Sequence, residues 1–205
     1  MKATVISATL LALAASAAAQ RYNTSAPFAL KIESANATLD GVYLSSCHAG
    51  AAIEELCLAG TTAPGSYGTY YHNTTADLDV EGFHTGPLFW NLPANVDGVL
   101  QNVSSGLSFL YRPFGSVALP LLQPGSGEIN VGFDADAKLF ISNDLIESTF
   151  TDSSYPNYTA PFPVYQWFAC FNYNLGYYYQ SLGWATTGVA TNPTCQPVNV
   201  TREFI

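Results

Sequence analysis

The chain has 205 residues, of which 48% are hydrophobic, 14% aromatic and only 10% charged, and its formal net charge is −9. This apolar content excludes an intrinsically disordered chain, and the length favours one domain. Six lysines and arginines against fifteen acidic residues exclude a basic nucleic-acid-binding surface, so no nucleic-acid partner is expected.

Residues 1–19 are predicted to form a secretory signal peptide. Lys2 supplies the positive charge at its start, residues 5–15 are apolar, and three alanines precede the predicted cleavage site before Gln20. Cleavage leaves residues 20–205 as a single β-rich extracellular domain with five cations, fifteen acids and a net charge of −10. The apolar run is too short to span a bilayer and no later run is longer, so no membrane association is expected.

Short alternations of apolar and polar residues, separated by turn-forming residues, run through the rest of the chain. Alternations occur at residues 28–33, 107–111 and 198–204, and turn sequences occur at 40–41, 97–98, 124–127 and 172–176. Short strands at this spacing predict an all-β fold, a single-domain antiparallel β-sandwich or barrel stabilised by two disulfides.

Six Asn-x-Ser/Thr sequons predict N-glycosylation, at Asn23, Asn36, Asn73, Asn102, Asn157 and Asn199. Asn192 is excluded because Pro193 follows it. Most of the six lie beside turn-forming residues, as expected of surface positions. Together with the leader they indicate a eukaryotic secreted glycoprotein, whose glycans can supply the solubility that charged side chains usually give.

The four cysteines, Cys47, Cys57, Cys170 and Cys195, allow three disulfide pairings. We favour Cys47–Cys57 and Cys170–Cys195, because each pair is local and closes a loop rich in small or amide residues. There is no C-x-x-C spacing, and an oxidising compartment disfavours zinc thiolates. Neither a metal nor a cofactor is expected.

Residues 49–58 allow two interpretations. Ala52, Ile53, Leu56 and Cys57 would share one face of a helix, whereas a turn centred on Ala52 would place Cys47 opposite Cys57 in a hairpin. We slightly favour the hairpin.

The one cluster of titratable residues lies at 72–84. Asp77, Asp79 and Glu81 alternate before Gly82, as in the first half of a calcium-binding loop, but Leu88 stands where that loop requires a glutamate. A polar face of an edge strand explains the same alternation, so no metal site is assigned.

No catalytic residue is assigned either. The chain has three histidines, at positions 48, 72 and 84, and no G-x-S-x-G nucleophile motif. An enzyme would need a cleft that joins His72 or His84 to the acids at 77–81.

Nine aromatic residues lie between positions 165 and 184, on either side of the predicted turn at 172–176. One interpretation is that their rings fill the core of the domain. The alternative is a carbohydrate-binding platform formed by Tyr177, Tyr178, Tyr179 and Trp184, with neighbouring Asn and Gln amides available to sugar hydroxyl groups.

The chain resembles a family of small secreted proteins of filamentous fungi that carries a domain of unknown function. The resemblance rests on residues 40–57, 86–92, 131–134, 165–170, 176–184 and 192–195. It covers nearly the whole predicted mature chain but transfers no activity. The C-terminal third has a weaker similarity to phialide-type fungal cell-wall proteins, which implies association with the wall.

We therefore expect a secreted, non-enzymatic fungal glycoprotein that is extracellular or associated with the cell wall, with cell-wall polysaccharide as its expected partner. The alternative is a carbohydrate-binding module or secreted effector that uses exposed aromatic residues.

Overall fold

The computed structural model of the protein describes residues 23–75, 78–127, 129–152 and 158–205. The predicted leader, its cleavage site at Gln20, Asp77 of the acidic cluster and the sequon at Asn157 lie outside these ranges. Within the described ranges, no helix is long and apolar enough to cross a membrane.

The described residues form strands and two short 3₁₀ turns, with no α-helix among them. The strands are β1 (Asn23–Thr24), β2 (Phe28–Glu33), β3 (Tyr43–Gly50), β4 (Ile53–Gly60), β5 (Tyr70–Thr74), β6 (Asp79–Val80), β7 (Phe83–His84), β8 (Gly86–Val96), β9 (Val99–Leu110), β10 (Val117–Pro124), β11 (Asn130–Phe133), β12 (Leu139–Leu145), β13 (Tyr158–Val164), β14 (Trp167–Asn174), β15 (Tyr177–Ala185), β16 (Gln196–Pro197) and β17 (Asn199–Phe204). The 3₁₀ turns are η1 (Gly65–Gly68) and η2 (Glu147–Thr149). The predicted all-β class is confirmed.

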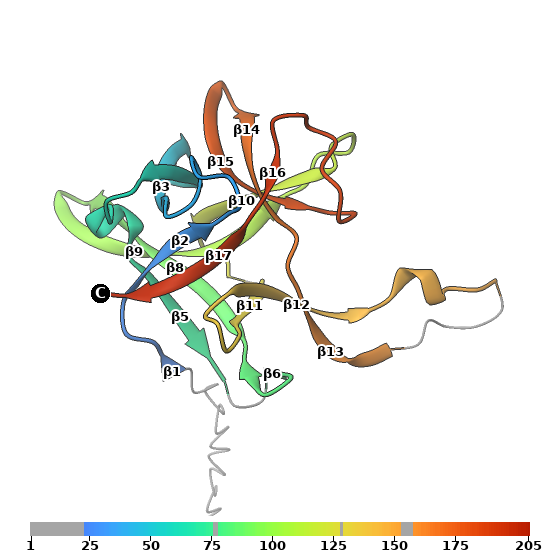
Figure 1. Ribbon diagram of the computed structural model, residues 1–205. Coiled ribbons are helices and arrows are strands. Elements are labelled where there is room, and N and C mark those ends of the chain that lie inside the picture. The colour runs from blue at the N-terminus through green and yellow to red at the C-terminus, as the bar shows by residue number, and fades with distance from the viewer. Residues whose placement is uncertain (1–22, 76–77, 128, 153–157) are drawn as a thin grey trace, which may run out of the picture.

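Eight strands close into an antiparallel barrel, in the order β5, β2, β3, β4, β15, β10, β9 and β8 (Figure 1). The pairing of β8 with β5, in which Trp90 lies opposite Tyr70, completes the ring. Closure leaves no free edge in the ring, which explains why the strands can be rich in apolar residues without inviting edge-to-edge association. Of the two predicted architectures, the barrel is therefore the correct one.

The β3–β4 hairpin confirms the hairpin interpretation of residues 49–58 and the Cys47–Cys57 disulfide. The expected register is wrong, because Cys47 lies opposite Glu55 and Cys57 lies opposite Ser45. The register shifts between His48 and Gly50, and Ala52 adopts a positive φ of 57° in the turn. The disulfide thus joins the two strands diagonally, across a Cα–Cα distance of 5.8 Å.

The barrel interior is filled by large apolar side chains. The largest fully buried side chains of this core are Trp90, Trp167, Tyr70 and Phe28. They come from strands far apart in the sequence, and the alternation in β2 places Phe28, Leu30 and Ile32 in this core as expected. Burial of each such side chain contributes about 1.5–3 kcal/mol.

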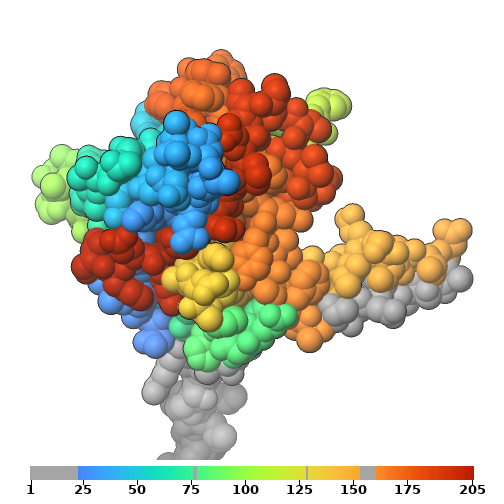
Figure 2. Space-filling view, viewed as in Figure 1, coloured from blue at the N-terminus to red at the C-terminus, as the bar shows by residue number. Residues whose placement is uncertain are grey.

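A second group of strands leaves the barrel. Strand β11 pairs with β8, and β12 and β13 follow as an arm that projects to one side in Figures 1 and 2. Asp134 accepts hydrogen bonds from the amides of Asp136 and Lys138 in the turn that precedes β12.

Candidate functional site

The aromatic-rich segment forms the hairpin β14–β15, which turns at Leu175 and Gly176 with φ values of 49° and 96°. Two successive positive φ values describe a type I′ turn, whose twist matches that of the flanking strands. In this register Trp167 lies opposite Trp184, and Tyr173 lies opposite Tyr178. Opposed residues of an antiparallel pair project from the same face, so the register decides which rings lie together.

The base of the hairpin contributes to the core. Trp167 is 1% exposed and donates its indole N–H to the carbonyl of Leu139 at 2.8 Å. Trp184 packs edge-on against it, with ring centroids 4.8 Å apart, and Phe109 contacts both rings. The interpretation of the aromatic residues as core therefore holds for this end of the hairpin.

The tip of the hairpin extends beyond the barrel and forms the protrusion at the top of Figure 2. On the same face as the buried tryptophans, Phe171, Tyr173 and Tyr178 are 41%, 60% and 64% exposed. The rings of Phe171 and Tyr178 stack at 5.6 Å with an interplanar angle of 24°. We call these three rings and Gln180, which lies opposite Phe171, the tip face.

The four residues predicted as a platform lie in three different settings. Tyr178 belongs to the tip face, whereas Tyr177 and Tyr179 project from the other face of the hairpin and stack on each other at 5.9 Å. The Tyr179 hydroxyl donates to the carbonyl of His48 at 3.2 Å. Trp184 lies at the far end of β15, half-buried against the core.

Trp184 also lines a separate groove of about 730 Å³ between the barrel and the arm. Gln166, Thr186 and Thr187 line the barrel side of this groove, and residues of β12 and β13 line the other. The groove combines one aromatic ring with several polar side chains, but it is not continuous with the tip face, because Trp184 and Tyr178 lie six residues apart on β15.

Phe171 and Tyr173 are the site residues that the sequence prediction missed. Both belong to the nine aromatics noted from the sequence, and a turn at Leu175–Gly176 would have placed Tyr173 opposite Tyr178. The exposure of the tip could not be read in this way, because it depends on where the barrel ends.

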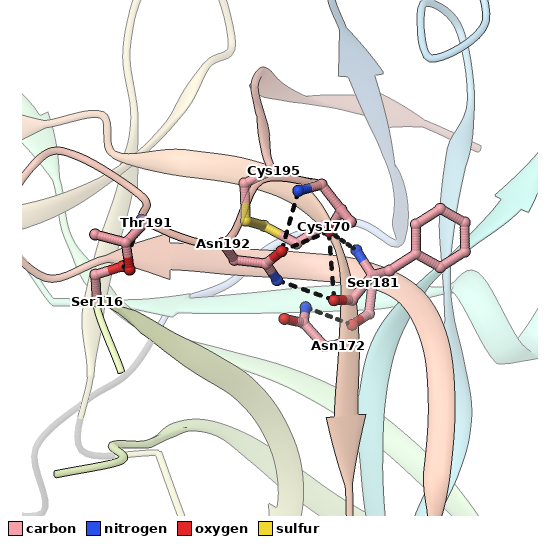
Figure 3. Close-up of a disulfide and its surroundings, with 9 residues drawn as sticks. Ser116, Cys170, Asn172, Ser181, Thr191, Asn192 and Cys195 are labelled. Carbon is pink, nitrogen blue, oxygen red and sulfur yellow. Dashed lines mark hydrogen bonds between the residues drawn. A yellow bond between two sulfur atoms is a disulfide. The ribbon is translucent and has the colours of Figure 1, made fainter. Parts of the chain in front are cut away.

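A disulfide and a polar loop fix the outer edge of the hairpin (Figure 3). Cys170 is bonded to Cys195, as predicted, and Asn192 donates its amide to the carbonyl of Phe171 at 3.0 Å. Thr194 accepts a hydrogen bond from the Phe171 amide at 3.0 Å. The backbone of Phe171 is thus satisfied by side chains rather than by a neighbouring strand, which holds the ring at a defined position.

A buried polar network supports the hairpin from the face opposite to the tip face. The Ser181 hydroxyl donates to the Glu55 carboxylate at 3.1 Å, and Asn172 donates to Ser181 at 3.0 Å, as Figure 3 shows for the latter pair. Glu55 is 2% exposed, and burial raises the pKa of its carboxyl group, although hydrogen bonds from Asn174 and Ser181 and the charge of Arg112 oppose this shift.

The exposed Arg112 extends this network to the protein surface. Its guanidinium donates to the carbonyl of Tyr173 and, at 3.4 Å, to the side chain of Asn174. A satisfied buried network has one favoured arrangement, so it orients the hairpin tip. Neither Glu55 nor Arg112 was predicted to contact the hairpin, because the contacts join strands that are far apart in the sequence.

Among the described members of the titratable cluster at 72–84, His72 and His84 line one pocket of about 310 Å³, but no described acidic side chain lines it with them. His72 is buried, and its Nε2 forms a hydrogen bond with the carbonyl of Val131 at 3.0 Å. Burial lowers the pKa of His72 to about 4. His84 lies at the surface, 3.7 Å from Asp79. Within the part of the chain that the structure describes, no group of three or more His, Cys, Asp or Glu could hold a metal ion.

Five of the six sequons lie within the described residues. Asn23 and Asn102 are exposed, whereas Asn36, Asn73 and Asn199 are partly buried. The side-chain amide of Asn36 donates to Gln196 at 2.6 Å, and its oxygen accepts from Thr38 of the same sequon. Because a glycan attaches at that amide nitrogen and leaves it one N–H, glycosylation at Asn36 would place the first sugar beside Gln196.

The fold and this surface define a disulfide-linked, closed β-barrel protein that presents a fixed aromatic hairpin. The chain belongs to the family defined by a domain of unknown function, DUF7907, whose model matches residues 25–204. No curated protein and no solved structure matches the chain. The expectation that nearly the whole predicted mature chain is a domain of unknown function is thus confirmed.

Proposed function

We propose that this protein is a secreted, non-enzymatic fungal glycoprotein that binds a cell-wall polysaccharide through the tip face. The observation that carries the proposal is the exposed stack of Phe171 and Tyr178 with Tyr173 beside it. Flat aromatic rings pack against the apolar faces of sugar rings, and a contiguous group of exposed rings on one element is the kind of surface that binds a partner.

The tip face has features that suit a polymer better than a small enclosed ligand. Its rings lie along a protruding hairpin rather than in a cavity, so a chain of sugars can pass over several of them. The Gln180 amide lies opposite Phe171 and can bond to sugar hydroxyl groups. Because the disulfide and the buried network already order the hairpin, little conformational entropy is lost on binding.

The extracellular location is supported by the chemistry of the chain. Two disulfides are the usual stabilisation of proteins in oxidising compartments, and the sequons at Asn23 and Asn102 are open to solvent. The leader predicted at residues 1–19 would deliver the chain to that compartment.

A non-enzymatic role is supported by the composition of the tip face. Hydrolysis of a glycosidic bond usually requires two carboxyl groups on either side of the bond. The tip face consists of three aromatic residues and one amide, and the nearby Glu55 carboxylate is buried against Ser181.

Co-sedimentation of the secreted, deglycosylated protein with chitin, β-glucan and cellulose tests the proposal. We expect one polymer to retain the wild type, and Tyr178→Ala with Tyr173→Ala to abolish retention. Tyr67→Ala is the matched control, because Tyr67 is 56% exposed on η1 and does not belong to the tip face. Equal retention of the wild type and the double variant would refute binding at the tip face.

Tryptophan emission separates the tip face from the groove beside Trp184. All three tryptophans lie away from the hairpin tip, so a polymer on the tip face should leave their emission unchanged. A shift in emission on binding would place the polymer in the groove instead. If no polymer retains the wild type, the secreted effector becomes the better interpretation, with the tip face as the surface to test against proteins.

A further inference from the structure

A second surface depression, separate from the tip face, contains an unusual cation. This pocket of about 310 Å³ lies at the end of β17 and is lined by His72, Phe133, Arg202, Thr74, His84 and Asn23, among others. Its volume is at the lower end of the range for small-molecule sites, which is sufficient for a ligand the size of one sugar.

Arg202 is held in the pocket by aromatic contacts. Its guanidinium lies 4.4 Å from the ring centroid of Phe133 and 5.1 Å from that of Phe204. The Phe133 ring in turn packs edge-on against the ring of His72, with centroids 5.4 Å apart. These contacts fix the plane of the guanidinium without using its hydrogen-bond donors.

The donors of Arg202 lack partners, unlike those of the other cations that the structure describes. Lys31 pairs with Glu203 and Lys138 with Asp136, at 3.5 and 3.4 Å. Among the described residues, no carboxylate lies within 4.0 Å of the Arg202 guanidinium, and its buried Nε has no hydrogen-bond partner. Buried donors and partly buried charges are normally paired, because leaving them unpaired is costly.

On the side that faces this pocket, the surroundings of Arg202 are suited to a negatively charged ligand, because no described acidic side chain lines the pocket. Acidic residues such as Asp136 and Glu203 line a neighbouring depression with Arg202, but none forms an ion pair with it within 4.0 Å. His72 is neutral at pH 7, since burial lowers its pKa to about 4, so it neither repels nor compensates the guanidinium. Burial also lowers the pKa of Arg202, which means that a counter-charge would stabilise it. A planar guanidinium with free donors binds carboxylate and phosphate groups in a forked geometry.

We propose that this pocket binds an oxyanion, with Arg202 as the residue that holds the charge. The shared chemistry is a carboxylate or phosphate group small enough to enter beside Phe133. Such a group can be free in solution or carried by an acidic sugar. The site does not depend on the tip face, so either proposal can fail without the other.

An NMR titration of the full-length secreted protein, with its glycans trimmed, tests this site. The probes are inorganic phosphate and glucuronate, added at constant ionic strength. We expect saturable shifts of the backbone amides of Phe133 and Arg202. Stronger binding of glucuronate would identify an acidic sugar as the source, and stronger binding of phosphate a free or esterified phosphate.

Three variants complete the test. Arg202→Gln should reduce the affinity by about ten- to a hundredfold, because hydrogen bonds to a charged group are lost. Lys138→Gln removes one paired surface charge and should bind as the wild type does. Arg202→Lys retains the charge and should fold even if Arg202→Gln does not, but it lacks the fork and should bind about tenfold more weakly. Absence of saturable shifts in the wild type, or equal affinity in the Arg202 variants, would overturn the proposal.

Discussion

The two ends of the β14–β15 hairpin carry the same kinds of side chain on the same face and differ in what covers them. At the base, the buried Trp167 and the half-buried Trp184 pack against each other and against Phe109. At the tip, Phe171 and Tyr178 stack in a comparable way but remain largely open to solvent. Strands β14 and β15 continue past the end of the barrel, so the rings at the tip are exposed whereas those at the base are covered.

The aromatic residues of one hairpin thus serve two purposes, stability at the base and an exposed surface at the tip. Burial of the base supplies stability, which in turn allows the tip to keep exposed rings in fixed positions. The disulfide at Cys170 and the network around Glu55 lie between the two ends and connect them. Substitutions at the base, at this junction and at the tip should therefore have different consequences.

The largest effect is expected at the base. Trp167→Ala should lower the free energy of unfolding by about 3–5 kcal/mol, because it leaves a cavity and an unpaired Leu139 carbonyl. Tyr178→Ala should change it by only about 0.5 kcal/mol. Chemical denaturation followed by circular dichroism measures both, and equal losses would show that the tip is part of the core after all.

At the junction, loss of the Cys170–Cys195 disulfide should lower the free energy of unfolding somewhat less than Trp167→Ala does. It closes a loop with a sequence separation of 25, against 10 for Cys47–Cys57. The chain-entropy model then predicts about 3.5 kcal/mol for Cys170→Ser with Cys195→Ser, and about 2.7 kcal/mol for the other pair. The first double variant alone should also increase hydrogen exchange at Phe171, and unchanged exchange there would mean that the loop at 192–195 holds the tip without the disulfide.

The buried Glu55 should give the junction a pH dependence. Because the pKa of Glu55 is raised in the folded state, the folded chain holds a proton that the unfolded chain has lost, so the free energy of unfolding falls as pH rises from 4.5 through the raised pKa. The lowered pKa of His72 acts with the opposite sign over the range from about 4 to 6.5, which makes the wild-type curve a sum of the two.

The variant Glu55→Gln isolates the contribution of Glu55 to the pH dependence of stability. The difference in unfolding free energy between the wild type and this variant should change with pH in the direction given above, and Glu33→Gln, at an exposed position, serves as the matched control. A pH-independent difference for Glu55→Gln would show that the contacts with Asn174, Ser181 and Arg112 fully offset burial, so that the pKa of Glu55 is the same in the folded and the unfolded chain.

The smallest effect on stability, and the sharpest on binding, is expected at the tip. Tyr178→Phe retains the flat ring stacked on Phe171 and should keep polysaccharide binding within about twofold, whereas Tyr178→Leu should weaken it about tenfold. Neither should shift the unfolding free energy by more than about 0.5 kcal/mol. Binding isotherms of both variants, measured on the polymer that retains the wild type, distinguish the two effects. Binding of Tyr178→Leu as strong as that of the wild type would contradict stacking as the mode of recognition.

Much of the fold could be predicted because it rests on local chemistry. The Asp97-Gly98 turn adopts the two positive φ values, 52° and 84°, that a type I′ hairpin requires, and the alternation at residues 28–33 matches the burial of Phe28, Leu30 and Ile32, although Ala29 is buried as well. Disulfide pairing followed from proximity in the chain. The register of the β3–β4 hairpin was not predictable at this level, because the irregularity between His48 and Gly50 leaves no mark in composition.

The candidate sites were predicted less well than the fold, for a physical reason. Alternation could place Tyr178 on a different face from Tyr177 and Tyr179, but it could not show how far the barrel covers that face. The exposure of the tip, the hydrogen bond from Ser181 to Glu55 and the lack of an ion pair at Arg202 among the described residues all depend on contacts between distant segments.

By itself, then, the sequence determined the β class, the main turns, the disulfide pairs and the presence of an aromatic hairpin, because each depends on residues that are close along the chain. Only the tertiary structure decided that the barrel closes, that it ends partway along β14 and β15, and that Arg202 lies in a pocket lined by no acidic side chain of the described residues. These features arise when strands distant in sequence pack together, since burial and charge pairing are set by three-dimensional neighbours.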